Sequence, residues 1–235
     1  MPTLLNRSRI CQRLLGPVRK TLQVRLPQTR PVLEQMLYAV CRRDVPRSEA
    51  DAAFSRLQQA FYDWNEVRVS AVREVADALA PLPQAFDRAE QLVRLLQEVF
   101  EAHYCFDLDG LKKKPLRQAE KQLHRLQAAD PFVLAWTMQY ALGGHAVPVD
   151  ESVRRVVVRL GLVQDGQPTP SVQTSLAHQF GKAQAQPLYE ILSAVAHRYC
   201  REEPVCGECP LQTCCPTARQ SRQPITPRIR RTKPR

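Results

Sequence analysis

The sequence predicts an all-α protein on the basis of three observations. Apolar residues recur at steps of three and four along most of the chain, which is the period of one helix face. Alternation typical of strands is scarce, and only eight of the 235 residues are glycine. Hydrophobic residues make up 44% of the chain, which is enough to form the core of one or two compact domains.

The first third of the chain predicts short helices separated by breaks. A short helix around residues 10–15 precedes a helix that begins near Pro31, because proline suits a first helical turn. Ser48-Glu-Ala-Asp51 is typical of the cap of the next helix. Asp63-Trp64-Asn65-Glu66 is interpreted as a loop.

The central part predicts three further helices. Ser70 is expected to cap a helix that the Pro81 and Pro83 pair ends, since the residue before a proline disfavours the helical conformation. Residues 84–104 have the clearest helical period, and residues 116–126 form the next helix.

The last third continues the same pattern. A helix from Phe132 to Tyr140 is expected to stop at Gly143-Gly144. A helix follows Asp150, and Thr169-Pro170 supplies the cap and first turn of another. A final helix leads to Cys200, and we expect the tail after Pro216 to be disordered.

The positive charge is concentrated at the two ends of the chain. The net charge is +11, but residues 1–30 and 217–235 each hold seven Lys or Arg and no acid. The 20 basic and 23 acidic residues between them give a net charge of −3. We therefore expect the basic ends, which include Arg228, Arg230 and Arg231, to bind phosphates.

A cysteine-rich stretch predicts a metal site near the C-terminus. Five of the eight cysteines lie in Cys200-Arg-Glu-Glu-Pro-Val-Cys206-Gly-Glu-Cys209-Pro-Leu-Gln-Thr-Cys214-Cys215. Thiolates are soft ligands that suit iron–sulfur clusters or zinc. Zinc sites usually have two C-x2-C pairs, whereas only Cys206 and Cys209 make such a pair here. A C-x5-C-x2-C-x5-C spacing favours a [4Fe–4S] cluster, with structural zinc and a disulfide knot as the alternatives.

This stretch resembles the cluster loop of the endonuclease III-like branch of the helix-hairpin-helix DNA glycosylases. That family has C-x6-C-x2-C-x5-C, so the first spacer here is one residue shorter. The resemblance implies a [4Fe–4S] cluster on Cys200, Cys206, Cys209 and Cys215, with Cys214 as the alternative fourth ligand. It also implies a two-lobed helical fold whose cluster loop lies at the C-terminal end.

A second segment carries the same resemblance. Pro148-Val149-Asp150-Glu151-Ser152-Val153-Arg154-Arg155-Val156 and the later Arg159-Leu160-Gly161-Leu162 resemble the family's V-D-T-H-V-x-R-V and R-L-G-L motifs. The resemblance implies a catalytic role for Asp150 in expelling a damaged base. The alternative is a structural role, because aspartate is a preferred N-cap whose charge suits the helix dipole. Ser152 stands where the family has histidine.

The hairpin of the family is altered in this chain. The family reads L-P-G-V-G-x-K-T-A, which aligns with residues 126–134. Both glycines are lost, Asp130 and Pro131 disfavour a phosphate contact, and Phe132 occupies the position of the lysine that attacks the sugar. A Schiff-base mechanism at this position is therefore excluded. The family's glutamine that fills the gap left by a flipped base is replaced near Cys41.

Other candidate DNA contacts have structural alternatives. Lys112, Lys113 and Lys114 form a basic run that is either a phosphate contact or a solvated surface. His145 lies five residues before Asp150 and is either a polar contact near the cleft or a structural residue. Trp64 and Trp136 are candidates for base stacking, with a place in the apolar core as the alternative. Lys121 and His124 lie one or two turns before the hairpin.

The resemblance implies a DNA-binding protein of base-excision repair. If active, it is expected to be a monofunctional DNA glycosylase that uses Asp150 and a water molecule on a flipped base. A catalytically silent cluster-bearing DNA-binding or scaffold protein is the alternative, and a redox protein is the third. The expected partner is double-stranded DNA, and the expected state is a monomer.

Four segments follow from this interpretation. They are a basic N-terminal segment at 1–30, a helical barrel-like domain at 31–145, a cluster domain at 146–216 completed by the N-terminal segment, and the tail at 217–235. No apolar run approaches the length of a membrane span. The first residues lack the apolar core of a signal peptide, so we expect a cytoplasmic protein.

Overall fold

A computed structural model gives the architecture and describes residues 4–220. Every regular element in this range is a helix, so the predicted all-α class is confirmed. In chain order the elements are α1 (Leu4–Arg13), the π-helix η1 (Leu14–Val18), α2 (Arg19–Thr21), α3 (Val32–Arg42), α4 (Arg47–Ala60), α5 (Trp64–Val69), α6 (Val72–Leu79), α7 (Ala85–His103), the 3-10 helix η2 (Asp109–Lys113), α8 (Leu116–Leu123), α9 (Pro131–Tyr140), α10 (Glu151–Arg159), α11 (Thr169–Gln179), α12 (Lys182–Arg198) and α13 (Pro216–Gln220).

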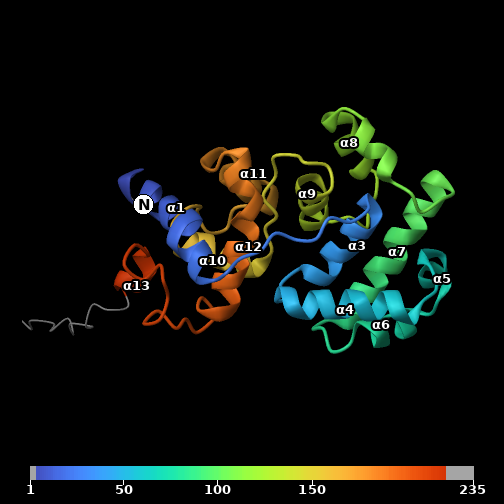
Figure 1. Cartoon of the computed structure of the whole chain (residues 1–235), viewed down its shortest axis with the longest axis horizontal. Helices are drawn as coiled ribbons and strands as arrows, with labels where there is room; N and C mark the ends of the chain where they lie inside the picture. Colours follow the sequence, from blue (N-terminus) through green and yellow to red (C-terminus); the bar gives the residue numbers. More distant parts are fainter. Residues whose placement is uncertain (1–3, 221–235) are drawn as a thin grey trace, which may run out of the picture.

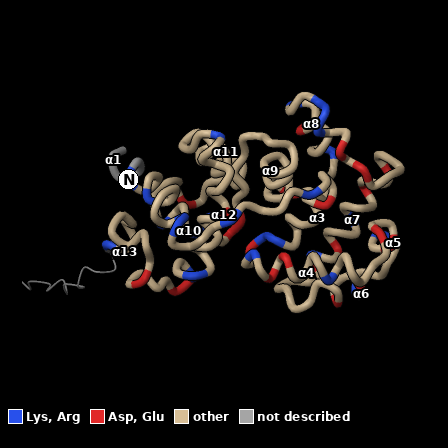
Figure 2. The backbone as a smooth tube through the Cα atoms, in the orientation of Figure 1, with Lys and Arg blue, Asp and Glu red and all other residues tan. Residues whose placement is uncertain are grey.

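The helices form two groups that lie side by side (Figure 1). One group contains α3 to α9, and the other contains α1 together with α10 to α13. Helix α12 packs against both η1 and α10, so the N-terminal and C-terminal parts of the chain share one group. Basic and acidic residues are mixed over both groups (Figure 2). The domain boundaries proposed from the sequence stay predictions.

The two groups meet where α3, α9 and α12 come together. Phe132 and Trp136 of α9 contact Tyr189 of α12, with ring centroids 5.4 and 5.3 Å apart. Tyr38 of α3 contacts Trp136 at 5.7 Å. Aromatic rings prefer such tilted or edge-to-face contacts, which add to the free energy gained from burial. This aromatic cluster joins α9 to α3 and α12.

Most predicted helices are confirmed. Helix α7 agrees with the helical period of residues 84–104, and Pro31 is the N-cap of α3. Helix α9 ends at Tyr140, and the chain then turns through Gly143, whose φ is 63°. A Cβ at Gly144 would lie 2.9 Å from the carbonyl oxygen of Met138, so the turn requires glycine there.

Several local predictions are wrong. The expected loop at residues 63–66 contains the start of α5, because the side chain of Asp63 accepts a hydrogen bond from the backbone N–H of Glu66 and caps a helix. Helix α4 begins at Arg47, before the predicted Ser48 cap, with Pro46 as its N-cap. Helix α6 begins after Ala71, while the hydroxyl of Ser70 donates to the carbonyl of Glu66.

The remaining differences lie near the C-terminus. The N-cap of α11 is Pro168, one residue before the predicted cap at Thr169. The tail was expected to be disordered after Pro216, but residues 216–220 form α13, since proline suits a first turn. The rest of the tail, from residue 221, lies outside the described residues. Among the described helices, none is both long and apolar enough to cross a membrane.

Candidate functional site

Asp150 caps α10 at the junction of the two helix groups. Its Oδ1 accepts a hydrogen bond from the backbone N–H of Val153 at 2.8 Å. Its Oδ2 accepts from the backbone N–H of Asp44 at 3.0 Å and from the hydroxyl of Tyr189 at 2.6 Å. The residue is 4% exposed. The capping role expected from the sequence is therefore present, and the carboxylate is enclosed.

Asp44 makes the reciprocal contact with α10. Its Oδ1 accepts from the backbone N–H of Ser152 at 2.7 Å, so two carboxylates share the start of this helix. Asp44 adopts a left-handed conformation with φ of 56°, which aspartate tolerates better than most residues. Burial raises the pKa of the Asp150 carboxyl, and the charge of Asp44 raises it further. The hydrogen bonds from Tyr189 and the two backbone amides oppose this shift.

The altered hairpin is closed by its own side chains. Asp130 Oδ1 accepts from the backbone N–H groups of Phe132 and Val133, both at 2.9 Å. Its Oδ2 pairs with Arg43, the C-cap residue of α3. The backbone N–H of Ala128 donates to Glu98 Oε2 at 3.0 Å. Carboxylates of the protein thus occupy the hairpin amides that a phosphate would otherwise approach.

A polar cavity lies beside α12 and contains residues that the sequence did not single out. Its volume is about 500 Å³, which is the size of a small-molecule site. Arg42 and Glu190 line it and are 1% and 4% exposed. Arg42 Nη2 donates to Glu190 Oε2 at 3.1 Å and to Ser193 Oγ at 3.0 Å. Glu190 Oε1 has no hydrogen-bond partner among the described residues.

Sequence neighbours of two cavity residues contact Asp150. Tyr189, which donates to Asp150, directly precedes Glu190 on α12. Arg42 and Asp44 lie in the same short stretch at the end of α3, with Arg42 on the cavity and Asp44 on Asp150. Residues 22–25 and Gln28 form another wall. The cavity and the buried carboxylate are therefore built from the same two segments, although Asp150 itself does not line the cavity.

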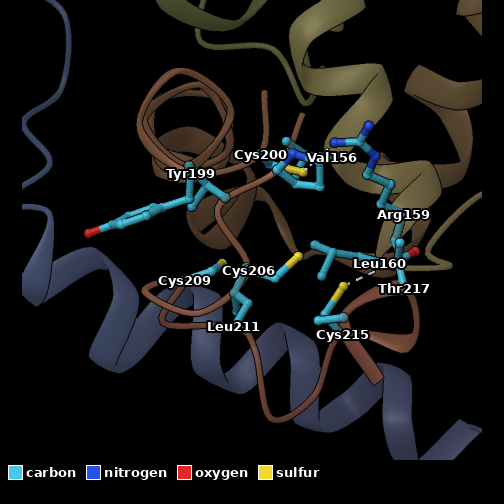
Figure 3. A pocket seen from close by; sticks show the side chains of 13 residues that line it. Val156, Arg159, Leu160, Tyr199, Cys200, Cys206, Cys209, Leu211, Cys215 and Thr217 are labelled. Carbon is cyan, nitrogen blue, oxygen red and sulfur yellow. Dashed lines mark hydrogen bonds between the residues drawn. The ribbon is translucent and has the colours of Figure 1, made fainter. Parts of the chain in front are cut away.

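Four cysteines line a second pocket, next to the end of α12 (Figure 3). They are Cys200, Cys206, Cys209 and Cys215. Burial, with a smaller contribution from the three neighbouring cysteines, raises the pKa of the Cys209 thiol to about 11. Cys214 does not line this pocket. It is fully buried, and its Sγ donates to the carbonyl of Leu211 at 3.3 Å.

Helix α10 holds the cysteine loop through two arginines. Arg159 Nη1 donates to Cys200 Sγ at 3.4 Å and to the carbonyl of Arg201, and its Nη2 donates to the carbonyl of Glu202 at 2.9 Å. Arg155 Nε donates to the carbonyl of Cys200 at 2.9 Å. The same helix therefore begins at Asp150 and ends against the cysteine loop.

The predicted metal site is seen only in part: the four cysteines line one pocket, but they do not converge on one point. Among residues 4–220, no group of three or more His, Cys, Asp or Glu side chains is arranged to hold one metal ion. A structural zinc ion needs four ligands that converge on one point. In a [4Fe–4S] cluster each cysteine binds a different iron atom, so its four sulfurs stand farther apart. The donor set of the pocket is consistent with a cluster, because all four side chains are thiols.

Comparisons with known proteins agree with the fold. No family model matches the sequence. DNA glycosylase/AP lyase ROS1 of Arabidopsis thaliana is 26% identical over 172 residues, which are 65% of this chain and 12% of that protein. Transcriptional activator DEMETER of the same plant is 23% identical over 193 residues, which are 74% of this chain and 10% of that protein. The chain thus spans about a tenth of the length of these curated relatives.

Solved structures match nearly the whole chain. An endonuclease III–DNA covalent intermediate has a TM-score of 0.71 at 17% identity, covering 95% of this chain and all of that one. A thermostable thymine-DNA glycosylase has a TM-score of 0.67 at 17% identity, covering 92% and 97% of the two chains. The chain has the helix-hairpin-helix DNA glycosylase fold. The resemblance to the endonuclease III-like branch is thereby confirmed for the fold.

Most of the predicted DNA contacts that the structure describes have partners within the protein. Lys112 pairs with Asp109 at 2.9 Å, Lys114 donates to Gln122 at 2.9 Å, and Lys113 is exposed. His145 Nε2 lies 2.9 Å from the carbonyl oxygen of Phe180, which is a structural contact. Three predicted contacts lie outside the described residues: Arg228, Arg230 and Arg231.

Phe132 stands where the family has its hairpin lysine, and this predicts that no Schiff base forms at that position. Phe132 is 3% exposed and packs on Trp136 and Tyr189, and its side chain has no amine. We expect borohydride treatment with abasic-site DNA to leave no covalent adduct at residue 132, because an imine requires a primary amine. Mass spectrometry of the tryptic peptides checks this. An adduct mapped to Lys121 would show that the nucleophile lies elsewhere in this chain.

Proposed function

We propose that this chain is a DNA-binding protein of base-excision repair that carries a [4Fe–4S] cluster. The observation that carries the proposal is the helix-hairpin-helix glycosylase fold with Asp150 as the N-cap of α10, together with a polar cavity lined by Arg42 and Glu190. One similar protein is named as a DNA glycosylase/AP lyase, and two of the matched structures are complexes of endonuclease III with DNA. Duplex DNA is therefore the expected partner, and a monomer the expected state.

The cavity beside Arg42 and Glu190 is the proposed site of an extrahelical base. Enzymes that act on a base in a duplex must take it out of the stack into a pocket that reads its polar edge. The unpartnered Glu190 Oε1 is positioned to accept an N–H group of such a base. Arg25 and Arg47 also line the cavity and bring positive charge toward the adjoining phosphates.

If the protein is active, it is a monofunctional glycosylase, which removes the base by hydrolysis and has no lyase step. Phe132 removes the lysine route, so a water molecule must attack the sugar. Asp150 is the acidic residue of the site that either stabilises positive charge on the sugar or accepts a proton from this water. Since its carboxylate is enclosed, the two helix groups must separate at Tyr189 before Asp150 reaches DNA.

That enclosure favours a second candidate, a catalytically silent DNA-binding protein. Three donors occupy the two oxygens of Asp150, and Asp150 lines neither the polar cavity nor the cysteine pocket. In this case the carboxylate holds α10 to α3 and α12 and has no chemical role. DNA binding and the cluster would remain, and excision would be absent.

The cysteine pocket supplies the ligands of the proposed cluster. Cys200, Cys206, Cys209 and Cys215 would hold it, and Cys214 would not, because its sulfur faces the loop backbone. Such a cluster ties the end of α12 to the C-terminal loop and provides a redox-active centre. Zinc is the alternative ion. A purely redox role lacks support beyond the cysteines themselves.

A comparison of Asp150→Asn with the wild type separates the two candidates. Asparagine can still cap the helix but cannot carry the negative charge. We expect purified wild type to release a base from one member of a panel of duplexes that each hold a single damaged or mispaired base. We expect the variant to be slower by about 10²-fold or more. The matched control is Asp165→Asn, which changes an exposed carboxylate whose side chain bonds only Gly166. Absence of product from the wild type across the panel would support the silent candidate.

A further inference from the structure

Helix α8 presents a stripe of exposed basic side chains just before the altered hairpin. Arg117 and Lys121 are four residues apart, so they lie on the same face of the helix. Arg125 follows four residues later, in the turn after the helix. All three are exposed. We call these three residues the α8 stripe. Figure 2 shows basic residues at α8, at the outer edge of the molecule.

The side chains of the α8 stripe are unpaired, unlike their neighbours. Among the described residues, none of the three makes an ion pair or a side-chain hydrogen bond, and the one acid of α8 is Glu120. Lys112 and Lys114, by contrast, are held by Asp109 and Gln122. An unpaired cation can bind an incoming anion without first losing an internal partner, so the α8 stripe is better prepared than the lysine run.

The hairpin that follows the α8 stripe is closed to anions. Asp130 takes the backbone N–H groups of Phe132 and Val133, and Glu98 takes that of Ala128. Both carboxylates would repel a phosphate at the amides themselves. The α8 stripe directly precedes the hairpin in sequence. Its positive charges would attract a phosphate that the hairpin amides can no longer bind.

We propose that the α8 stripe binds backbone phosphates of duplex DNA and takes over the anchoring role that the hairpin amides have lost. This proposal deepens the proposed function and rests on it. Contacts of arginine and lysine with phosphates position a duplex without reading its sequence. The α8 stripe should therefore contribute equally to the binding of any duplex of the same length.

Salt-dependent binding tests this proposal with the full chain. The variant is Arg117→Gln with Lys121→Gln, and the matched control is Arg73→Gln with Lys182→Gln, which removes two other exposed cations on α6 and α12. Fluorescence anisotropy with a labelled duplex at several KCl concentrations gives log K against log salt. The slope of log K against log salt is negative, and each neutralised phosphate contributes about 0.9 to its magnitude. We expect the α8 variant, which loses two cations, to have a slope smaller in magnitude by about 1.8. We expect the control slope to equal that of the wild type.

The outcomes separate this proposal from the function on which it rests. If wild type binds duplex DNA and the α8 variant keeps its affinity and its salt slope, the α8 stripe is not a phosphate contact. If wild type itself does not bind, the proposed function fails first. A charge-conserving variant, Arg117→Lys with Lys121→Arg, should bind like wild type, and circular dichroism should show the same helical content in all four proteins.

Discussion

Replacing Cys206 or Cys209 by alanine should remove the iron from the purified protein, whereas Cys214→Ala should leave it bound. Cys206 and Cys209 line the cysteine pocket. Cys214 is fully buried, and its sulfur lies against the carbonyl of Leu211. A cluster held by four thiolates cannot be retained with the same stability by three. Anaerobic purification followed by iron analysis should give about four irons per wild-type chain and almost none in the two pocket variants.

Two controls make this result specific. Cys105→Ala removes an exposed thiol far along the chain from the pocket and should leave the iron content unchanged. Cys215→Ala should lose the iron, because Cys215 lines the pocket. The opposite result, with iron lost in Cys214→Ala and kept in Cys215→Ala, would move the fourth ligand. Stoichiometric zinc without iron in the wild type would replace the cluster by a zinc site.

Replacing Arg42 by methionine should destabilise the protein by about 3–5 kcal/mol, because it leaves the buried Glu190 carboxylate without its charged partner. Arg42 is 1% exposed, and its guanidinium joins α3 to Glu190 and Ser193 of α12 and also donates to the carbonyl of Val45. The arginine side chain also faces the ring of Tyr189, at 4.9 Å from its centroid. Urea unfolding followed by circular dichroism measures the change in the free energy of unfolding.

A double variant tests whether the loss of stability comes from the ion pair. Arg42→Met with Glu190→Met removes both buried charges, so we expect it to be more stable than Arg42→Met alone. The exposed Arg73→Met serves as the control and should change the free energy of unfolding by less than about 0.5 kcal/mol. A single Arg42→Met variant as stable as the wild type would contradict a stabilising role for the buried ion pair.

The helices could be predicted because their signals are local. Helix α7 follows from the spacing of its own apolar residues, and Asp150 was identified as a cap from its place before α10. Errors occurred where two local signals compete. At residues 63–66 polar residues indicated a loop, although Asp63 is also a good N-cap, and the cap decided the structure.

The candidate site was only half predictable, because its second half joins distant parts of the chain. Arg42 and Glu190 are 148 positions apart, and neither belongs to a recognisable motif. Their meeting depends on the packing of α3 against α12, which no local pattern records. Asp44 and Asp150 are likewise 106 positions apart, so the reciprocal capping that encloses Asp150 was not foreseen.

The hairpin illustrates the same limit. Its altered residues predicted the loss of a phosphate contact, and Phe132 at the position of the family's lysine predicted that no Schiff base forms there. The sequence did not predict that Asp130 would occupy the amides of α9 and pair with Arg43, because that partner lies 87 positions away.

Binding to a duplex with a single abasic-site analogue, compared with the same duplex undamaged, tests the central claim most directly. If the protein takes a nucleotide out of the stack, a site without a base avoids the cost of unpairing and unstacking. This measurement does not depend on knowing the substrate base or on catalytic activity. We expect tighter binding of the abasic duplex at equal salt. Equal affinity for the two duplexes, or no binding to either, would contradict the proposal that this fold receives an extrahelical nucleotide.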